Sequence, residues 1–242
     1  MKLKVESFFI NVGITIVCYI VFIVFTSLTN YFNNKTLPTI GLSTLYIFSL
    51  FLLIRYFNKS IYNISVKQFI GNGHLKGILT SILMITIVFT VPYFAISDSD
   101  YIFSWNKELI ESIISNSIVA ISEELIFRAF FFLSMIVVIR KHLISALLAS
   151  LVFTFIHFFR LESVVHFLWI FSASMLMTYI YYATKSLFSN ILFHMLINVL
   201  MSYVFVSVGQ LQNLLITQII IMSFLTIIIL FLLKNKFANH IH

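Results

Sequence analysis

The chain has 242 residues, of which 61% are apolar and only 10% are charged, whereas a soluble domain carries about 25% charged residues. This composition excludes an ordinary soluble domain. The net charge of +7 does not indicate nucleic-acid binding, because the basic residues are scattered between apolar segments and do not cluster with stacking aromatics. The single cysteine, Cys18, excludes a disulfide framework and a cysteine-based zinc site.

The apolar segments predict helices, because none shows the alternating pattern of a membrane barrel strand. About 20 apolar residues cross the hydrocarbon layer as a helix. We therefore expect eight membrane spans, at residues 8–28, 38–54, 75–96, 109–139, 143–159, 164–183, 187–208 and 214–233. The first span lacks a signal-peptide cleavage site and is too long for a signal sequence, so we expect it to be retained.

The fourth predicted span, residues 109–139, is unusually long. As one helix it would reach about 45 Å, so it must tilt, break or extend into the headgroups. No repeat, linker or change in composition divides the chain. We therefore expect a single integral-membrane domain over residues 1–242, an all-α, polytopic transmembrane helical bundle.

Lysine and arginine predict the orientation of this bundle, because they are retained in cytoplasmic loops. With both termini in the cytoplasm, only three basic residues fall outside: Lys35, Lys107 and Arg160. Arg128 lies inside a span, and the remaining basic residues are cytoplasmic: Lys2, Lys4, Arg55, Lys59, Lys67, Lys76, Arg140, Lys141, Lys185, Lys234 and Lys236. This asymmetry supports eight spans, since one helix more or fewer would abolish it.

Polar residues within the spans are candidates for function, because an ionisable side chain at the centre of a bilayer costs on the order of 3 kcal/mol. They occur in three spans: Glu123, Glu124 and Arg128 in the fourth, Phe153 and His157 in the fifth, and His194 and Asn198 in the seventh. His166, near the start of the sixth span, has no such companions, and we expect it to lie at the interface or to pack there.

Glu123 and Glu124 must have different neighbours, because adjacent helix positions diverge by about 100°. Glu124 and Arg128 are four residues apart and can form an ion pair on one face of the helix. Glu123 is then left without this cation and becomes the candidate general base. The alternative is that all three form a buried ion network that only fixes helix packing.

The two histidines suggest hydrolysis. Phe153 lies one turn before His157 and can restrict its imidazole, while His194 and Asn198 lie one turn apart on the same face. No serine, threonine or cysteine completes a nucleophile relay with them, so water is the expected nucleophile. Two histidines and a carboxylate are also a common catalytic zinc set, although the HExxH signature is absent.

The three motifs E-E-x-x-x-R, F-x-x-x-H and H-x-x-x-N, in this order on successive membrane helices, resemble those of the CPBP intramembrane metalloprotease family. This family includes CAAX prenyl endopeptidases, bacteriocin-processing enzymes and proteins linked to bacteriocin self-immunity. The resemblance covers residues 109–208, the expected catalytic core. One departure is Ala129, where many members have glycine.

The resemblance implies roles for these residues. Glu123 would activate water, Glu124 and His157 would complete the water or metal site, and His194 and Asn198 would stabilise the oxyanion or bind the metal. Arg128 and Phe153 would support them. The implied cofactor is a divalent metal, zinc, on Glu124, His157 and His194, with a metal-free glutamate mechanism as the alternative.

The expected function is an endopeptidase in the bacterial plasma membrane that cleaves a peptide or membrane-associated protein, such as a bacteriocin or signal peptide. The expected partners are this substrate and the lipid bilayer, not nucleic acid, and the sequence does not predict an oligomeric state. One alternative is a non-catalytic scaffold or bacteriocin self-immunity protein that retains the site. A proton-coupled transporter would also use buried carboxylates, but its duplicated architecture is not seen in the sequence.

Overall fold

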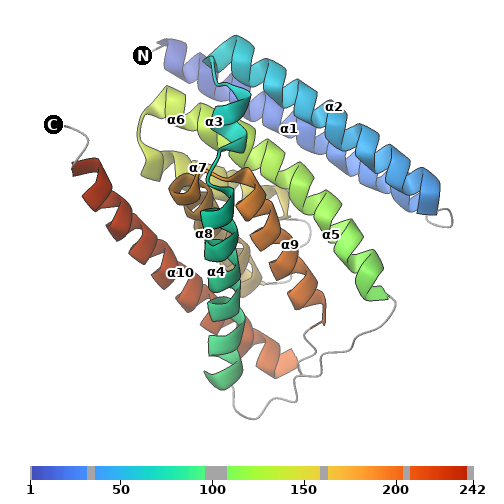
Figure 1. Ribbon diagram of the computed structural model, residues 1–242, viewed down its shortest axis with the longest axis vertical. Coiled ribbons are helices and arrows are strands. Elements are labelled where there is room, and N and C mark those ends of the chain that lie inside the picture. The colour runs from blue at the N-terminus through green and yellow to red at the C-terminus, as the bar shows by residue number, and fades with distance from the viewer. Residues whose placement is uncertain (1, 32–35, 96–107, 159–162, 204–207, 239–242) are drawn as a thin grey trace.

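The computed structural model describes residues 2–31, 36–95, 108–158, 163–203 and 208–238, and helices dominate throughout them (Figure 1). The only β-type pairing among these residues is an isolated bridge between Gly71 and Ser186. The prediction of an all-α membrane helical bundle is confirmed.

Each predicted span corresponds to a helical segment. In chain order the segments are α1 (Lys2–Tyr31), α2 (Thr36–Tyr62), α3 (Val66–Ile70), α4 (His74–Ala95), α5 (Glu108–Glu124), η1 (Leu125–Phe132), α6 (Leu133–Ile139), α7 (His142–Ile156), α8 (Val164–Thr184), α9 (Leu187–Tyr203) and α10 (Val208–Ala238). The short helix α3 was not predicted. Its start is fixed by Gln68, whose side chain accepts a hydrogen bond from the backbone N–H of Ser65 at 2.6 Å.

The outer helices of the bundle are expected to be surrounded by lipid. In the part of the chain that the structure describes, four helical stretches are long and apolar enough to cross a membrane: Gly41–Tyr62, His74–Pro92, Val164–Thr184 and Gln212–Leu232. Large apolar side chains such as Leu45, Leu83 and Phe224 are exposed on them, as expected of surfaces that face lipid. In α8, by contrast, 67% of the apolar window is buried. It packs against α4, α7, α9 and α10 and is the central helix of the bundle.

The long fourth span is neither broken nor interrupted by a loop. It runs through α5, η1 and α6, and its middle part, Leu125–Phe132, is π-helical. A π-helix bonds each N–H to the carbonyl five residues earlier, and π-helical turns are frequent at functional sites. All eight residues of η1 are buried. This wide segment begins immediately after Glu123 and Glu124.

The turn between α3 and α4 contacts the turn between α8 and α9 through backbone atoms. The backbone N–H of Asn72 donates to the Lys185 carbonyl at 3.1 Å. Gly71 has a φ of 82°, and a Cβ there would lie 1.5 Å from the same carbonyl oxygen. Only glycine satisfies both the backbone angle and the contact.

We therefore expect Gly71→Ala to lower the thermal unfolding temperature in detergent, at a cost of more than about 1 kcal/mol, because the new methyl group requires a strained φ and a displaced Lys185. Gly13→Ala is the matched control, since nothing lies within 4 Å of its added Cβ. The control should be neutral or slightly stabilising, as alanine favours helix. Equal unfolding temperatures for the two variants would contradict this account of the corner.

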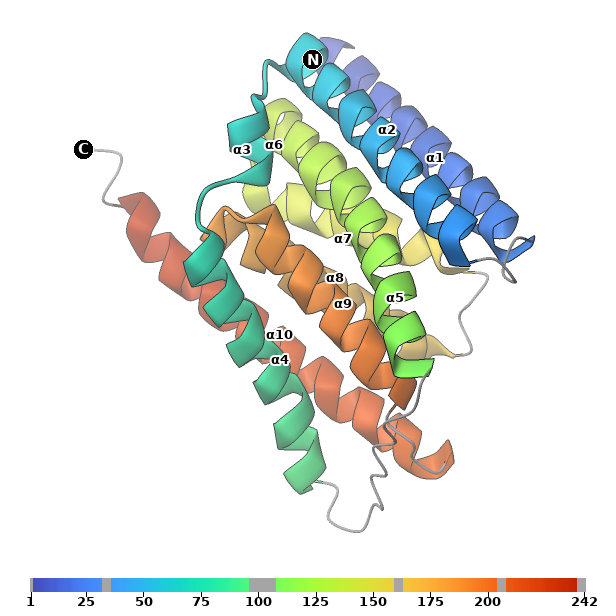
Figure 2. The same ribbon diagram turned by 45° about the vertical axis from the view of Figure 1, so that its right-hand side comes forward.

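The fold gathers the corners that carry basic residues at one end of the bundle. Lys185 lies at the corner that contacts Asn72, and the His142 ring stacks on Tyr182 with centroids 5.4 Å apart, which brings the start of α7 to this corner. Figures 1 and 2 show α3 and α6 at this same end. The three basic residues expected outside, Lys35, Lys107 and Arg160, lie beyond the described residues, so the orientation stays a prediction.

Candidate active site

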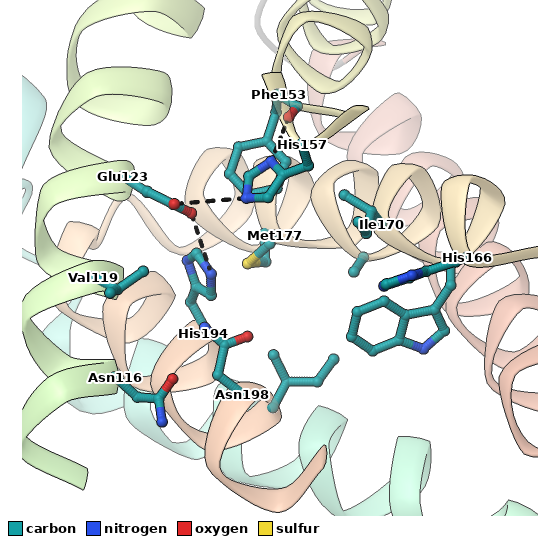
Figure 3. A pocket seen from close by; sticks show the side chains of 13 residues that line it. Asn116, Val119, Glu123, Phe153, His157, His166, Ile170, Met177, His194 and Asn198 are labelled. Atoms are coloured by element: carbon teal, nitrogen blue, oxygen red, sulfur yellow. Dashed lines mark hydrogen bonds and ion pairs between the residues drawn. The ribbon is translucent and has the colours of Figure 1, made fainter. Parts of the chain in front are cut away.

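Three of the predicted site residues, each from a different helical element, meet around one carboxylate (Figure 3). Glu123, on the last turn of α5, is only 2% exposed. One of its oxygens lies 3.6 Å from Nε2 of His157, and the other lies 3.6 Å from Nε2 of His194. These residues were predicted on three different spans, and the bundle brings them together.

His157 lies at the end of α7 and not inside the helix. The span predicted to reach residue 159 ends as a helix at Ile156, and His157 is its C-cap. Its Nδ1 is 2.7 Å from the carbonyl oxygen of Phe153. A carbonyl can only accept, so Nδ1 carries the proton, and the lone pair of the neutral ring is on Nε2. The Phe153 ring also packs beside the imidazole, with centroids 4.7 Å apart.

His194 is oriented in the same way by a carboxylate. Its Nδ1 lies 2.8 Å from Oε1 of Glu124, and Arg128 is 3.0 Å from the same oxygen. An ionised carboxylate accepts, so the Nδ1–H of His194 donates to Glu124, and its Nε2 lone pair faces Glu123. Both imidazoles therefore present lone pairs to Glu123.

This arrangement places three hydrogen-bond acceptors against one another. With neutral imidazoles no proton lies between either Nε2 and Glu123, and a separation of 3.6 Å is too long for a direct hydrogen bond. The group is satisfied only by a cation, by an added proton, or by a water molecule that donates to it. The geometry is thus one in which a water molecule, a metal ion or a proton can lie between Glu123 and the imidazoles.

Glu124 lies on the opposite side of His194 from this group. It is fully buried, and besides Arg128 and His194 it accepts a hydrogen bond from Nδ2 of Asn190. Its predicted ion pair with Arg128 is therefore present. Its expected role as a metal ligand stays a prediction. In the structure its oxygens contact these three partners, and it is not among the residues that line the cavity.

Asn190 was missed in the sequence. It lies one helical turn before His194 on α9 and is fully buried, so the complete pattern on this helix is N-x-x-x-H-x-x-x-N. The spacing puts all three polar side chains on one face of the helix. A buried asparagine at that position could have been recognised as a further member of the set.

Arg128 has partners beyond Glu124. Its Nη2 donates to Oγ of Ser174 at 3.0 Å, and its guanidinium carbon lies 4.7 Å from the centre of the Phe153 ring. Arg128 is only 1% exposed, so it links η1 to the central helix α8 and to the aromatic residue beside His157. The supporting roles expected for Arg128 and Phe153 agree with this placement.

Asn58 on α2 holds the π-helical segment that follows the two glutamates. It is fully buried, and its Nδ2 donates to the carbonyl oxygen of Ala129 at 2.8 Å. This residue was also missed, because its partner is 71 positions away in the sequence.

We expect Asn58→Leu, a replacement of similar size, to destabilise the protein by about 1 kcal/mol through loss of this buried hydrogen bond. Because the bond anchors η1 just after Glu123, it should also lower the turnover of any processed peptide. Thermal unfolding and cleavage assays would be compared with Asn72→Leu, whose side chain is exposed. An effect no larger than that of the control would remove Asn58 from the support of the site.

A cavity of about 280 Å³ opens beside Glu123, His157 and His194. Asn198 also lines it, one turn beyond His194, as predicted from the spacing. So does His166 on α8, which was expected only to pack at the interface. Most of the remaining wall is apolar, with Val119, Ile170, Ala173, Met177 and Ile197.

Among the described residues, no group of three or more His, Cys, Asp or Glu side chains is arranged so that it could hold a metal ion. The donor types are nevertheless suitable for a divalent ion. Two zinc ligands in a tetrahedral site are about 3.4 Å apart, close to the 3.6 Å that separates each Nε2 from Glu123. The residues that fit are thus Glu123, His157 and His194.

Comparison with known proteins agrees with the motifs. The family model described as type II CAAX prenyl endopeptidase Rce1-like matches residues 105–200. This range contains all seven motif residues, from Glu123 to Asn198. No curated protein and no solved structure matches the chain.

Proposed function

Since the chain belongs, through residues 105–200, to the CPBP family of CAAX-type intramembrane endopeptidases, we propose that it hydrolyses peptide bonds with a water molecule activated at Glu123. The observation that carries this proposal is the convergence of the Glu123 carboxylate with two imidazole lone pairs at the edge of a cavity.

The proposed reaction begins with water between Glu123 and the two imidazoles. Glu123 accepts a proton as the water oxygen bonds to the scissile carbonyl carbon. The carbonyl oxygen becomes an oxyanion, and Nδ2–H of Asn198 donates to it. Glu123 then gives its proton to the peptide nitrogen, the C–N bond breaks, and the products are a new carboxylate and a new amine.

The buried residues around the site keep its geometry during this cycle. Glu124 holds Nδ1–H of His194, and the Phe153 carbonyl holds that of His157. Each Nε2 is thereby fixed as an acceptor that faces the reacting water. Arg128 balances the charge of Glu124.

We further propose that a divalent metal, zinc, completes the site. His157 and His194 would hold it through Nε2, with Glu123 as the neighbouring carboxylate in place of the Glu124 expected from sequence. Such an ion makes water a stronger acid and polarises the scissile carbonyl. Outer carboxylate and carbonyl partners of metal-binding histidines are the usual means of fixing the ring orientation, and Glu124 and Phe153 are placed for this.

The proposed substrate is a peptide or a membrane-associated protein segment in a bacterial plasma membrane that the chain crosses several times, with bacteriocin leaders and signalling peptides as the favoured classes. The scaffold or self-immunity alternative predicts activity without hydrolysis. A protective or partner-capturing phenotype that survived loss of Glu123 would favour that alternative.

His194→Ala tests this function. We expect the purified wild-type protein to hold one divalent ion per chain and the variant to lose both the ion and the peptide cleavage seen in membranes that contain the wild type. Elemental analysis and mass spectrometry of the peptides measure the two losses. His142→Ala is the control, because His142 stacks on Tyr182 away from the cavity. Cleavage by metal-free His194→Ala protein at the wild-type rate would overturn the proposal.

A further inference from the structure

The side chains that line the cavity beside Glu123 differ in exposure from one side of the cavity to the other. At its floor Glu123 and His194 are 2% and 4% exposed, whereas Asn116, His166 and Asn198 on its rim are half-buried. These three lie in a common direction from the floor: Asn116 is two turns before Glu123 on α5, Asn198 is one turn after His194 on α9, and His166 is near the start of α8. Figure 3 shows them around the open part of the cavity.

The opposite side of the floor is closed. Glu124, Arg128 and Asn190 are at most 1% exposed, and they are joined to one another and to Ser174 by ion pairs and hydrogen bonds. The wide helix η1, buried along its whole length, continues from there. A peptide therefore cannot reach Glu123 from that side without opening this buried network.

The wall of the cavity near its rim is firmly held. The indole N–H of Trp169 donates to Oε1 of Gln218 on α10 at 2.8 Å, and Gln218 is fully buried. The α8 side of the rim is thus held against α10. Its mixture of amide and imidazole groups with apolar residues suits an extended peptide, whose backbone needs hydrogen-bond partners and whose apolar side chains need a dry wall.

The rim lies away from the end of the bundle that carries the basic corners. That end holds Lys67, Lys76, Arg140 and Lys185 at or beside the turns around α3, α6 and α8. In Figures 1 and 2 the start of α5 and the end of α9 lie at the other end. Since lysine and arginine mark the cytoplasmic side, the predicted orientation turns the rim toward the extracytoplasmic side.

We propose that the substrate enters this cavity from the extracytoplasmic side, as an extended segment of an exported peptide or of a membrane protein exposed at the outer leaflet, with apolar side chains beside the scissile bond. The identity of the entering molecule as a substrate rests on the proposed function, whereas the side of entry does not. The proposal excludes cytoplasmic C-terminal tails as the substrate class.

Cysteine labelling tests the side of entry. Cys18, which is buried, is replaced by serine, and one cysteine is then introduced as Asn116→Cys on the rim, Glu111→Cys further out on α5, or Asn72→Cys at the opposite end. A membrane-impermeant maleimide is applied to intact cells and to inverted vesicles. His166→Cys is a second rim position in case Asn116→Cys does not fold.

We expect the rim and Glu111→Cys to react in intact cells, and Asn72→Cys to react only in inverted vesicles. Reaction of the rim only from inverted vesicles overturns the proposal. So does a rim cysteine that stays unlabelled in intact cells while Glu111→Cys is labelled there and the denatured rim variant reacts. Repeating the labelling with Glu123→Gln separates the two questions, because accessibility does not require catalysis.

Discussion

Glu123→Gln is expected to lower peptide cleavage by about 10²–10⁴-fold, the usual contribution of a general base, while the protein keeps its fold. The amide has the same shape as the carboxylate but cannot accept the proton of water. Glu123 is the only carboxylate on the cavity wall among the described residues, so no neighbour there can replace it. Initial cleavage rates in reconstituted membranes measure the effect.

The control for this variant is Glu111→Gln on the same helix α5, where the side chain is exposed. It should keep the wild-type rate. Both variants should unfold in detergent at temperatures close to that of the wild type. A Glu123→Gln protein that is folded and cleaves at the wild-type rate would assign proton transfer to another group.

Glu124→Gln is expected to have the largest effect on stability, a loss of about 3–5 kcal/mol, because it leaves a buried guanidinium without its counter-charge. Arg128 is only 1% exposed and pairs with Glu124 at 3.0 Å. The variant should also cleave poorly, because His194 loses the carboxylate that orients it. Thermal unfolding in detergent measures the stability change.

A double variant separates these two effects. Glu124→Gln combined with Arg128→Met removes both charges of the pair, and we expect it to recover much of the stability lost in Glu124→Gln, since the buried guanidinium is removed with its partner. It should not recover cleavage, because His194 still lacks its carboxylate and Glu123 loses the nearby positive charge of Arg128. If the double variant loses as much stability as the two single changes together, Glu124 and Arg128 are not coupled in the way the structure indicates.

Much of this site could be predicted from local spacing. Glu124 and Arg128, like His194 and Asn198, are four residues apart in their helices, and this spacing alone places each pair on one face. That Glu123 and Glu124 have different neighbours also followed from the angle between adjacent helix positions. Polar residues in apolar spans stand out because lipid disfavours them.

The remainder depends on contacts between distant parts of the chain. No sequence pattern predicts that η1 is π-helical. Nor does one predict that Asn58 on α2 donates a hydrogen bond to the carbonyl oxygen of Ala129 in η1. The position of Glu124 against Nδ1 of His194 depends on how α5 packs against α9. Glu124 was expected among the metal ligands, whereas the structure places it against Nδ1 of His194 and places Glu123 beside Nε2 of both His157 and His194.

The end of α7 illustrates the same limit. Phe158 and Phe159 extend the apolar run past His157, so hydropathy predicts a helix to residue 159. The helix instead ends at Ile156, and the turn at His157 directs the ring toward Glu123. Hydropathy reports the solvent of a segment and not the residue at which its backbone leaves the helix.

The most direct test of water-dependent cleavage at Glu123 is hydrolysis in H₂¹⁸O. Membranes with wild-type or Glu123→Gln protein are incubated in labelled water, and the C-termini of the released peptides are analysed by mass spectrometry. We predict that ¹⁸O enters newly formed C-termini with the wild type and that these peptides are absent with Glu123→Gln. The same labelled C-termini in equal amounts from both membranes would contradict the account.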